Sequence, residues 1–153
     1  MLPFRMLLCV VALALLAVTV ESSSSSGSGS RNYNYDLSGP DLTRLFNSPV
    51  RHAERVERPI NGPLSAFGVK HSGVRVTLDD DSQWLIHKGD GYGKSSQTVV
   101  TDARHMSSAW EPSGTSRDFD GSKTVSDFVA AGGSDYRLLR DNCHHASGRM
   151  MGQ

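Results

Sequence analysis

The chain has 153 residues and carries 16 Lys and Arg against 16 Asp and Glu, so its formal net charge is zero. This length fits one domain. The balanced charge gives no global attraction to nucleic acid or to anionic lipid, so we expect no nucleic-acid partner. Of the two cysteines, Cys9 lies near the N-terminus and Cys143 near the C-terminus.

Residues 1–20 are typical of a secretory signal peptide. Arg5 precedes an apolar run that ends near Val20, and this run is shorter than the roughly 20 residues that a membrane-spanning helix needs. We therefore predict a secreted, extracellular protein without a stable membrane span, and an uncleaved anchor is the alternative. Removal of this segment takes Cys9 away and leaves Cys143 as the single cysteine.

Residues 21–63 are expected to form a flexible leader and a polar arm. The stretch 22–30 consists of Ser and Gly, a composition that buries too little apolar surface to offset the entropy of ordering it. Residues 31–63 contain few apolar side chains, so we predict that this arm is only partly ordered. The folded domain is accordingly placed at residues 64–153.

A β-hairpin is predicted at the start of that domain. Residues 67–78 alternate in the manner of a strand, residues 79–82 (Asp-Asp-Asp-Ser) supply turn chemistry, and residues 83–87 return as the partner strand. The face expected to be buried carries Val74, Val76 and Leu78.

The remaining elements give an α+β order. A third strand is predicted at 97–101, after a glycine-rich turn at 89–93. Residues 102–122 show little periodicity and are expected to be an irregular loop anchored by Trp110. Residues 123–131 have apolar side chains at helical spacing and end at a Gly-Gly pair, so they predict a helix.

A short C-terminal helix is predicted to begin at Cys143. Asp141 or Asn142 is suited to cap this helix. A helix N-terminus favours negative charge, so a thiol at this position is expected to have a lowered pKa and to be reactive. The alternatives for an unpaired cysteine in a secreted chain are a buried inert side chain or a disulfide to another chain, which would make a dimer through Cys143.

His71 and His87 are the candidate partners of this thiol. The predicted hairpin places His71 near the start of one strand and His87 near the end of the other, so the two should be neighbours across the ladder. An imidazole activates a thiol by forming an ion pair with it, and a second polar group can orient that imidazole. The residue types therefore predict a Cys-His-His arrangement.

The order of these motifs resembles the lecithin retinol acyltransferase family and the HRAS-like suppressor phospholipases and acyltransferases, which are related to NlpC-type cell-wall peptidases. The resemblance implies a permuted papain-like α+β domain with a small antiparallel sheet. The matching segments are His71-Ser72-Gly73-Val74, Trp84-Leu85-Ile86-His87 and Asn142-Cys143-His144-His145.

The resemblance also implies a function for each site residue. Cys143 would be the nucleophile, His71 the general base and acid, and His87 the orienting partner; the Cys143 N–H would be a candidate oxyanion donor. The chain would then be a hydrolase or acyltransferase that works through an acyl-enzyme, on a small-molecule, lipid or peptide substrate with an ester or amide. It would need no cofactor and no metal.

Two other functions are compatible with the sequence. The arm at 31–63 could dock a partner, which would make the chain a non-catalytic interaction protein of the same fold. Alternatively, four side chains are of types that bind zinc. They are His71, His87, Cys143 and His145.

Overall fold

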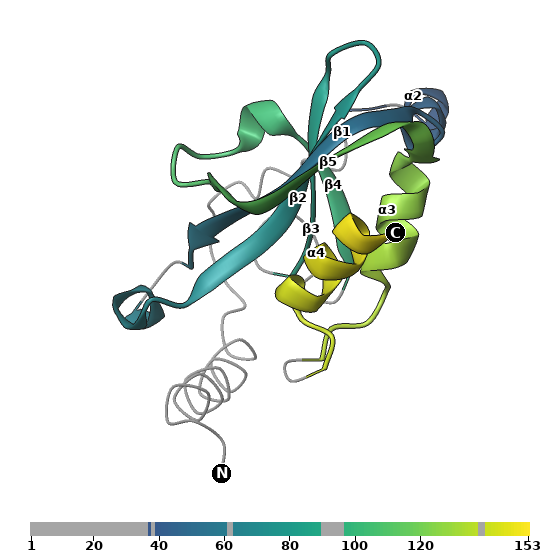
Figure 1. Ribbon diagram of the computed structural model, residues 1–153. Coiled ribbons are helices and arrows are strands. Elements are labelled where there is room, and N and C mark those ends of the chain that lie inside the picture. The colour runs from purple at the N-terminus through teal and green to yellow at the C-terminus, as the bar shows by residue number, and fades with distance from the viewer. Residues whose placement is uncertain (1–36, 38, 61–62, 90–96, 138–139) are drawn as a thin grey trace, which may run out of the picture.

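A five-stranded antiparallel sheet forms the centre of the molecule, in the strand order β4-β3-β2-β1-β5 (Figure 1). The structure is a computed structural model and describes residues 37, 39–60, 63–89, 97–137 and 140–153. The strands are β1 (Pro49–Pro59), β2 (Lys70–Leu78), β3 (Gln83–Lys88), β4 (Thr98–Asp102) and β5 (Glu111–Thr124). The helices are α2 (Gly39–Phe46), α3 (Val125–Gly132) and α4 (Cys143–Gly152), with 3-10 turns η3 (Pro63–Phe67) and η4 (Ala103–His105).

The expected arm contains a central strand, so the predicted domain boundary at residue 64 is wrong. β1 pairs with β2 on one side and with β5 on the other. Its register shifts twice, between Val50 and His52 and between Glu54 and Val56. The first irregularity interrupts the alternation of side chains, so Val50 and Ala53 both face the main core although they are three residues apart, and Val56, three residues further on, is buried on the opposite face. This spacing hides the strand from a search for a period of two.

The predicted hairpin and third strand are confirmed. β2 and β3 pair antiparallel, and Val74, Val76 and Leu78 are all buried. The Asp80 carboxylate accepts hydrogen bonds from the backbone N–H and hydroxyl of Ser82 at the hairpin tip. The third strand is β4, which pairs with β3. Most of the predicted glycine-rich turn after β3, and all of the predicted signal peptide, lie outside the described residues.

The prediction of an irregular loop at 102–122 is also wrong, because most of this segment belongs to the edge strand β5. Phe119 is the only position of β5 classed as buried, so the strand has no apolar alternation to detect. Gly114, Asp120 and Gly121 adopt positive φ and interrupt it further. The expectation that Trp110 anchors this region is confirmed, since its side chain packs with Val56 and Leu85.

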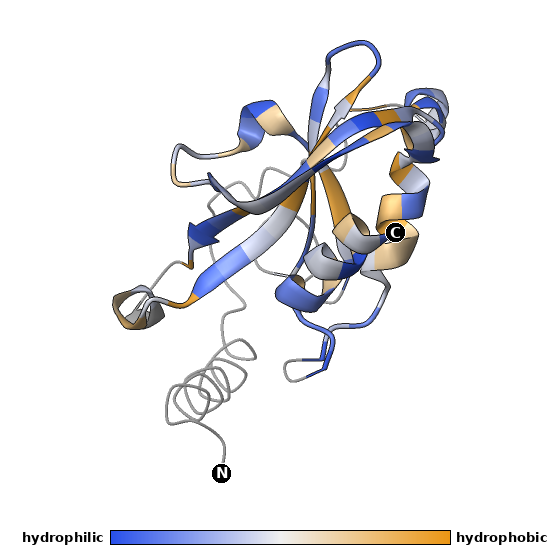
Figure 2. Ribbon diagram, in the orientation of Figure 1, coloured by the Kyte–Doolittle hydropathy of each residue, from blue (hydrophilic) through white to orange (hydrophobic). Residues whose placement is uncertain are grey.

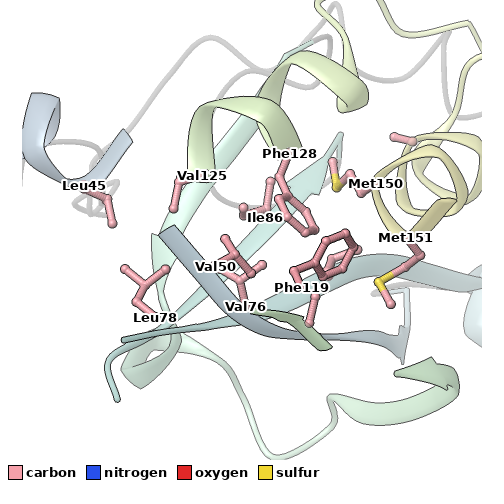
Figure 3. Close-up of a cluster of buried hydrophobic side chains, with 13 residues drawn as sticks. Leu45, Val50, Val76, Leu78, Ile86, Phe119, Val125, Phe128, Met150 and Met151 are labelled. Carbon is pink, nitrogen blue, oxygen red and sulfur yellow. The ribbon is translucent and has the colours of Figure 1, made fainter. Parts of the chain in front are cut away.

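The main core fills one face of the sheet, beneath α3 and α4 (Figures 1 and 3). Phe128 of α3 meets Phe119 of β5 edge to face, with ring centroids 5.1 Å apart. Met150 and Met151 of α4 complete this cluster. Figure 2 shows the corresponding apolar colouring on α3 and on the strands below it. The predicted helix at 123–131 is therefore confirmed as α3, a core element.

A smaller cluster of Val56, Leu85 and Trp110 covers the opposite face of the sheet. Because side chains alternate along a strand, neighbouring residues of β2 serve different faces. Val74 packs into the main core, whereas a Cβ on Gly73 would touch Leu85 and His87 on the other side. This division decides where the candidate site residues lie.

An added methyl group is expected to have opposite effects on stability at two glycines, one at the end of α3 and one inside α4. A Cβ on Gly132 would lie 2.6 Å from Met150 Cε and would also clash with Thr98, whose hydroxyl is held by the Gly133 carbonyl. We expect Gly132→Ala to lower the free energy of unfolding by about 1–3 kcal/mol through overpacking. Gly148, inside α4, has no heavy atom within 4 Å of such a Cβ, so Gly148→Ala should raise it by up to about 1 kcal/mol. Urea unfolding measures both, and an unchanged midpoint for Gly132→Ala would contradict this packing.

Candidate active site

His71 and His87 form a buried pair on the Trp110 face of the sheet. His71 Nε2 lies 3.0 Å from His87 Nδ1, at hydrogen-bond distance. The prediction that the two histidines are neighbours is therefore confirmed. Gly73 lies directly opposite His87 in the register, and a Cβ on it would come within 2.9 Å of His87 Cβ. The absence of a side chain at Gly73 lets the imidazole of His71 reach diagonally across the ladder.

The surroundings of this pair keep His71 neutral. Trp110 packs edge-on against both imidazoles, with centroid distances of 5.6 Å to His71 and 6.3 Å to His87. Burial lowers the pKa of His71 to about 3, and the positive charges of Arg58 and of His144, when protonated, act in the same direction. At neutral pH His71 is thus an uncharged imidazole, in which one nitrogen donates and the other accepts.

Cys143 is the first residue of α4, as predicted, and Asn142 is the residue that caps it. The Asn142 Oδ1 accepts hydrogen bonds from the backbone N–H groups of His144 at 3.0 Å and His145 at 3.1 Å. The thiol is free and its residue is 7 % exposed. The sequence therefore located the helix start, the cap and the cysteine correctly.

The expected lowering of the Cys143 pKa is wrong, because burial raises it. Four hydrogen-bond donors oppose this effect without cancelling it. They are the backbone N–H and the hydroxyl of Ser72 and the backbone N–H groups of His144 and Cys143 itself. The sulfur thus has donors suited to a thiolate, but the loss of solvent destabilises the thiolate more than these hydrogen bonds stabilise it.

The thiol approaches β2 beside His71. Its partner Ser72 directly follows His71, and the Ser72 hydroxyl also lies 3.1 Å from the Ser147 hydroxyl of α4. Consecutive side chains of a strand point to opposite faces, so Ser72 faces α4 while His71 faces Trp110. Among the described residues, the hydrogen bonds join His71 to His87 and the thiol to Ser72, and none joins Cys143 to His71.

An ion cluster around the buried Lys88 holds the segment that leads into α4. Lys88 follows His87 in β3 and is fully buried; its Nζ lies 2.8 Å from Asp141 Oδ1 and donates to the Gly132 carbonyl at 3.0 Å. Arg149 of α4 donates to the same two groups, at 2.7 Å each. These hydrogen bonds lower the pKa of Asp141 against the opposing effect of its partial burial. Asp141 immediately precedes the cap, so the cluster fixes the entry to α4.

A second polar cluster joins α4 to the other strands and was not found from the sequence. The ring of His144 lies between β1 and β2, with Nδ1 3.1 Å from Arg55 Nη2 and Nε2 3.0 Å from the Lys70 carbonyl oxygen. Glu57 Oε1 lies 3.2 Å from the same Arg55 nitrogen. No local pattern signals these contacts, because Arg55 and His144 are 89 positions apart.

A shallow groove lies on the face of the sheet that carries the two histidines, but its lining includes neither histidine and not Cys143. Its lining mixes charges of both signs with serines, and Trp110, which touches both imidazoles, forms part of it. The lining residues are Arg75, Asp81, Gln83, Asp102, Ala103, Arg104, Met106, Ser107, Ser108 and Trp110.

Comparisons with known proteins found no family model, no curated protein and no solved structure that matches this chain. The family resemblance and the chemistry it implies therefore remain hypotheses. None of the helices in the described ranges has the length and apolar character needed to cross a bilayer.

The zinc alternative required His71, His87, Cys143 and His145 to converge. Within the part of the chain that the structure describes, no group of three or more His, Cys, Asp or Glu residues is placed to hold a metal ion. His145 instead points its Nδ1 at the Asn142 side chain, 2.8 Å away. The structure does not bring the four residues together.

The Ser72 contacts predict a measurable change in the thiol. Ser72→Ala removes a hydroxyl that lowers the Cys143 pKa, so we expect the pH profile of iodoacetamide alkylation to move to higher pH. Ser147→Ala is the matched control, since it removes the Ser72–Ser147 hydrogen bond and leaves the Ser72–thiol contact in place. A profile that moves equally in both variants, or in neither, would contradict a direct Ser72–sulfur hydrogen bond.

Proposed function

We propose that the chain is a cysteine-dependent hydrolase or acyltransferase that acts on an ester or amide through an acyl-enzyme at Cys143. The observation that carries the proposal is the buried pair of His71 Nε2 and His87 Nδ1, 3.0 Å apart. Nδ1 of His71 is the ring nitrogen outside this contact. The Cys143 sulfur is held at the very next residue, Ser72, on the α4 face of β2, so the proposal requires the thiol and Nδ1 to come together when the substrate binds. The α+β class and the order His71, His87, Cys143 support a permuted papain-like domain as part of the same proposal.

The neutral state of the pair suits His71 to act as a base. If His71 carries its proton on Nε2, this nitrogen donates to His87 Nδ1, and His71 Nδ1 keeps a lone pair. As the sulfur attacks the carbonyl carbon, the thiol proton moves to His71 Nδ1, a C–S bond forms and the carbonyl π electrons move to oxygen. The Cys143 N–H at the start of α4 is a donor for that oxyanion.

Collapse of this intermediate completes the acylation. The C–O or C–N bond breaks, and the leaving alcohol or amine takes the proton from His71. Water or an acceptor hydroxyl or amine then attacks the thioester, and His71 again takes the proton. The C–S bond breaks, and the Cys143 sulfur recovers its proton from His71. His87 acts by holding the imidazole of His71, through the hydrogen bond between them, in the orientation that both steps need.

In this proposal the Cys143 thiolate and the His71 imidazolium form only in the complex with substrate. The raised pKa of Cys143 and the lowered pKa of His71 keep both groups neutral at rest. Catalytic hydrogen bonds are often long before substrate binds and tighten in the reacting complex. The donors of Ser72 and His144 around the sulfur would then stabilise the thiolate as it forms.

A non-catalytic interaction protein is the second candidate. The observation that favours it is the burial of Cys143, which raises the thiol pKa and leaves the residue 7 % exposed. A thiol so enclosed also offers little surface for a disulfide with a second chain, so the predicted Cys143-linked dimer would require movement of α4. The two candidates differ in whether Cys143 can be acylated.

Acylation by an activated ester tests the proposal. We expect p-nitrophenyl acetate to give a Cys143 thioester, seen as an acetyl adduct by intact mass and peptide mapping. His71→Ala should slow its formation at least about 100-fold, the usual contribution of a general base. His52→Ala is the control, because His52 pairs with Asp118 at the surface of β1 and β5. An adduct of equal yield in folded Cys143→Ala, or a folded wild-type chain that is never acylated, would overturn the proposal; the second result would favour an interaction protein.

A further inference from the structure

We propose that His144 is a positioning residue, which fixes the Cys143 turn of α4 against the backbone of β2 on either side of His71. Its ring hydrogen-bonds to the Lys70 carbonyl, which belongs to the peptide bond immediately before His71. The sulfur of Cys143 contacts the N–H of Ser72, in the peptide bond immediately after His71. His144 and Cys143 thus hold the two peptide groups that flank the proposed base.

The partners of His144 determine which nitrogen of its ring carries the proton. A carbonyl oxygen can only accept, so Nε2 must donate its hydrogen to Lys70 O. Nδ1 of the neutral ring is then an acceptor, and it faces Arg55 Nη2 at 3.1 Å, which can only donate. Both ring nitrogens are satisfied in one tautomer, and this fixes the rotation of the ring. A second proton on Nδ1 would put two donors face to face.

Charged side chains of β1 and β2 surround the ring of His144. Arg55 of β1 is the nearest cation, and Glu57 Oε1 is the nearest anion at 3.9 Å from Nδ1. Glu57 is itself engaged by Arg55 at 3.2 Å and by Lys70 Nζ at 3.6 Å. The two neighbouring cations therefore share one carboxylate, and the imidazole serves as a hydrogen-bonded bridge between β1 and β2.

The backbone of His144 connects this bridge to the thiol. Its N–H group is directed at the start of α4, where it donates to Asn142 Oδ1 at 3.0 Å and contributes a hydrogen bond to the Cys143 sulfur. A rotation of the first turn of α4 would move this N–H and the sulfur together, away from β2. The ring of His144 opposes that rotation because it is anchored at Lys70 and Arg55. Loss of the ring contacts should accordingly weaken the donor set around the sulfur.

The test replaces His144 by side chains that are uncharged, as a neutral imidazole is. His144→Phe keeps the aromatic volume and removes both hydrogen bonds, whereas His144→Gln keeps one acceptor and one donor. We expect His144→Phe to slow iodoacetamide alkylation of Cys143 near neutral pH roughly three- to tenfold and to move its pH profile upward, with partial rescue in His144→Gln. His145→Phe, on the same turn, is the matched control, because its ring bonds to Asn142 and to neither strand.

A wild-type alkylation profile in folded His144→Phe would overturn the positioning role, as would an equal change in His145→Phe. If His144→Phe does not fold, Arg55→Lys provides the second test. It keeps the positive charge and removes the planar donor that meets Nδ1, and it should move the profile in the same direction; an unchanged profile would again overturn the role. The catalytic importance of His144 rests on the proposed function, but alkylation needs no acyl substrate. If the wild-type chain is not acylated but His144→Phe changes the pH profile of alkylation, the proposed enzyme activity is rejected and the positioning role of His144 stands.

Discussion

The docking of the first turn of α4 onto the backbone of β2 is the constraint on which the candidate site depends. The Cys143 sulfur contacts Ser72, and the His144 ring holds the Lys70 carbonyl. Behind this turn, the fully buried Lys88 ammonium is neutralised by Asp141, one residue before the Asn142 cap. A buried ammonium that lost this partner would carry a large desolvation cost, so the segment has little freedom to place the thiol elsewhere.

Burial also determines the charge state of the site. A helix N-terminus and several N–H donors favour a thiolate, but desolvation of Cys143 outweighs them and raises its pKa. The same loss of solvent, with Arg58 nearby, lowers the pKa of His71 to about 3. Both effects disfavour charge, so the closed site holds a thiol and an imidazole, and not an ion pair. In the proposed enzyme, substrate binding must supply the conditions under which charge develops.

The sequence predicted the features that depend on local patterns. The alternation of apolar residues predicted β2 and its buried face. The aspartate-rich turn predicted the hairpin, and with it the proximity of His71 and His87. The capping residue Asn142 predicted the start of α4. β1 and β5 were missed because irregular register in β1 and exposure of β5 remove the period of two. Tertiary burial reversed the expected direction of the Cys143 pKa, and the His144–Arg55 contact joins residues too distant in sequence for any local signal.

The central claim is that the His71–His87 pair is buried and uncharged beside the docked thiol. Imidazole ¹⁵N chemical shifts of His71, followed by NMR from about pH 4.5 to pH 8, test it most directly, since an unperturbed histidine titrates within this range. We predict that His71 stays neutral throughout, with its proton on Nε2 and an unprotonated Nδ1, because its pKa is lowered to about 3. A His71 that gains a second proton near the ordinary value of about 6.5 would contradict the closed, desolvated site.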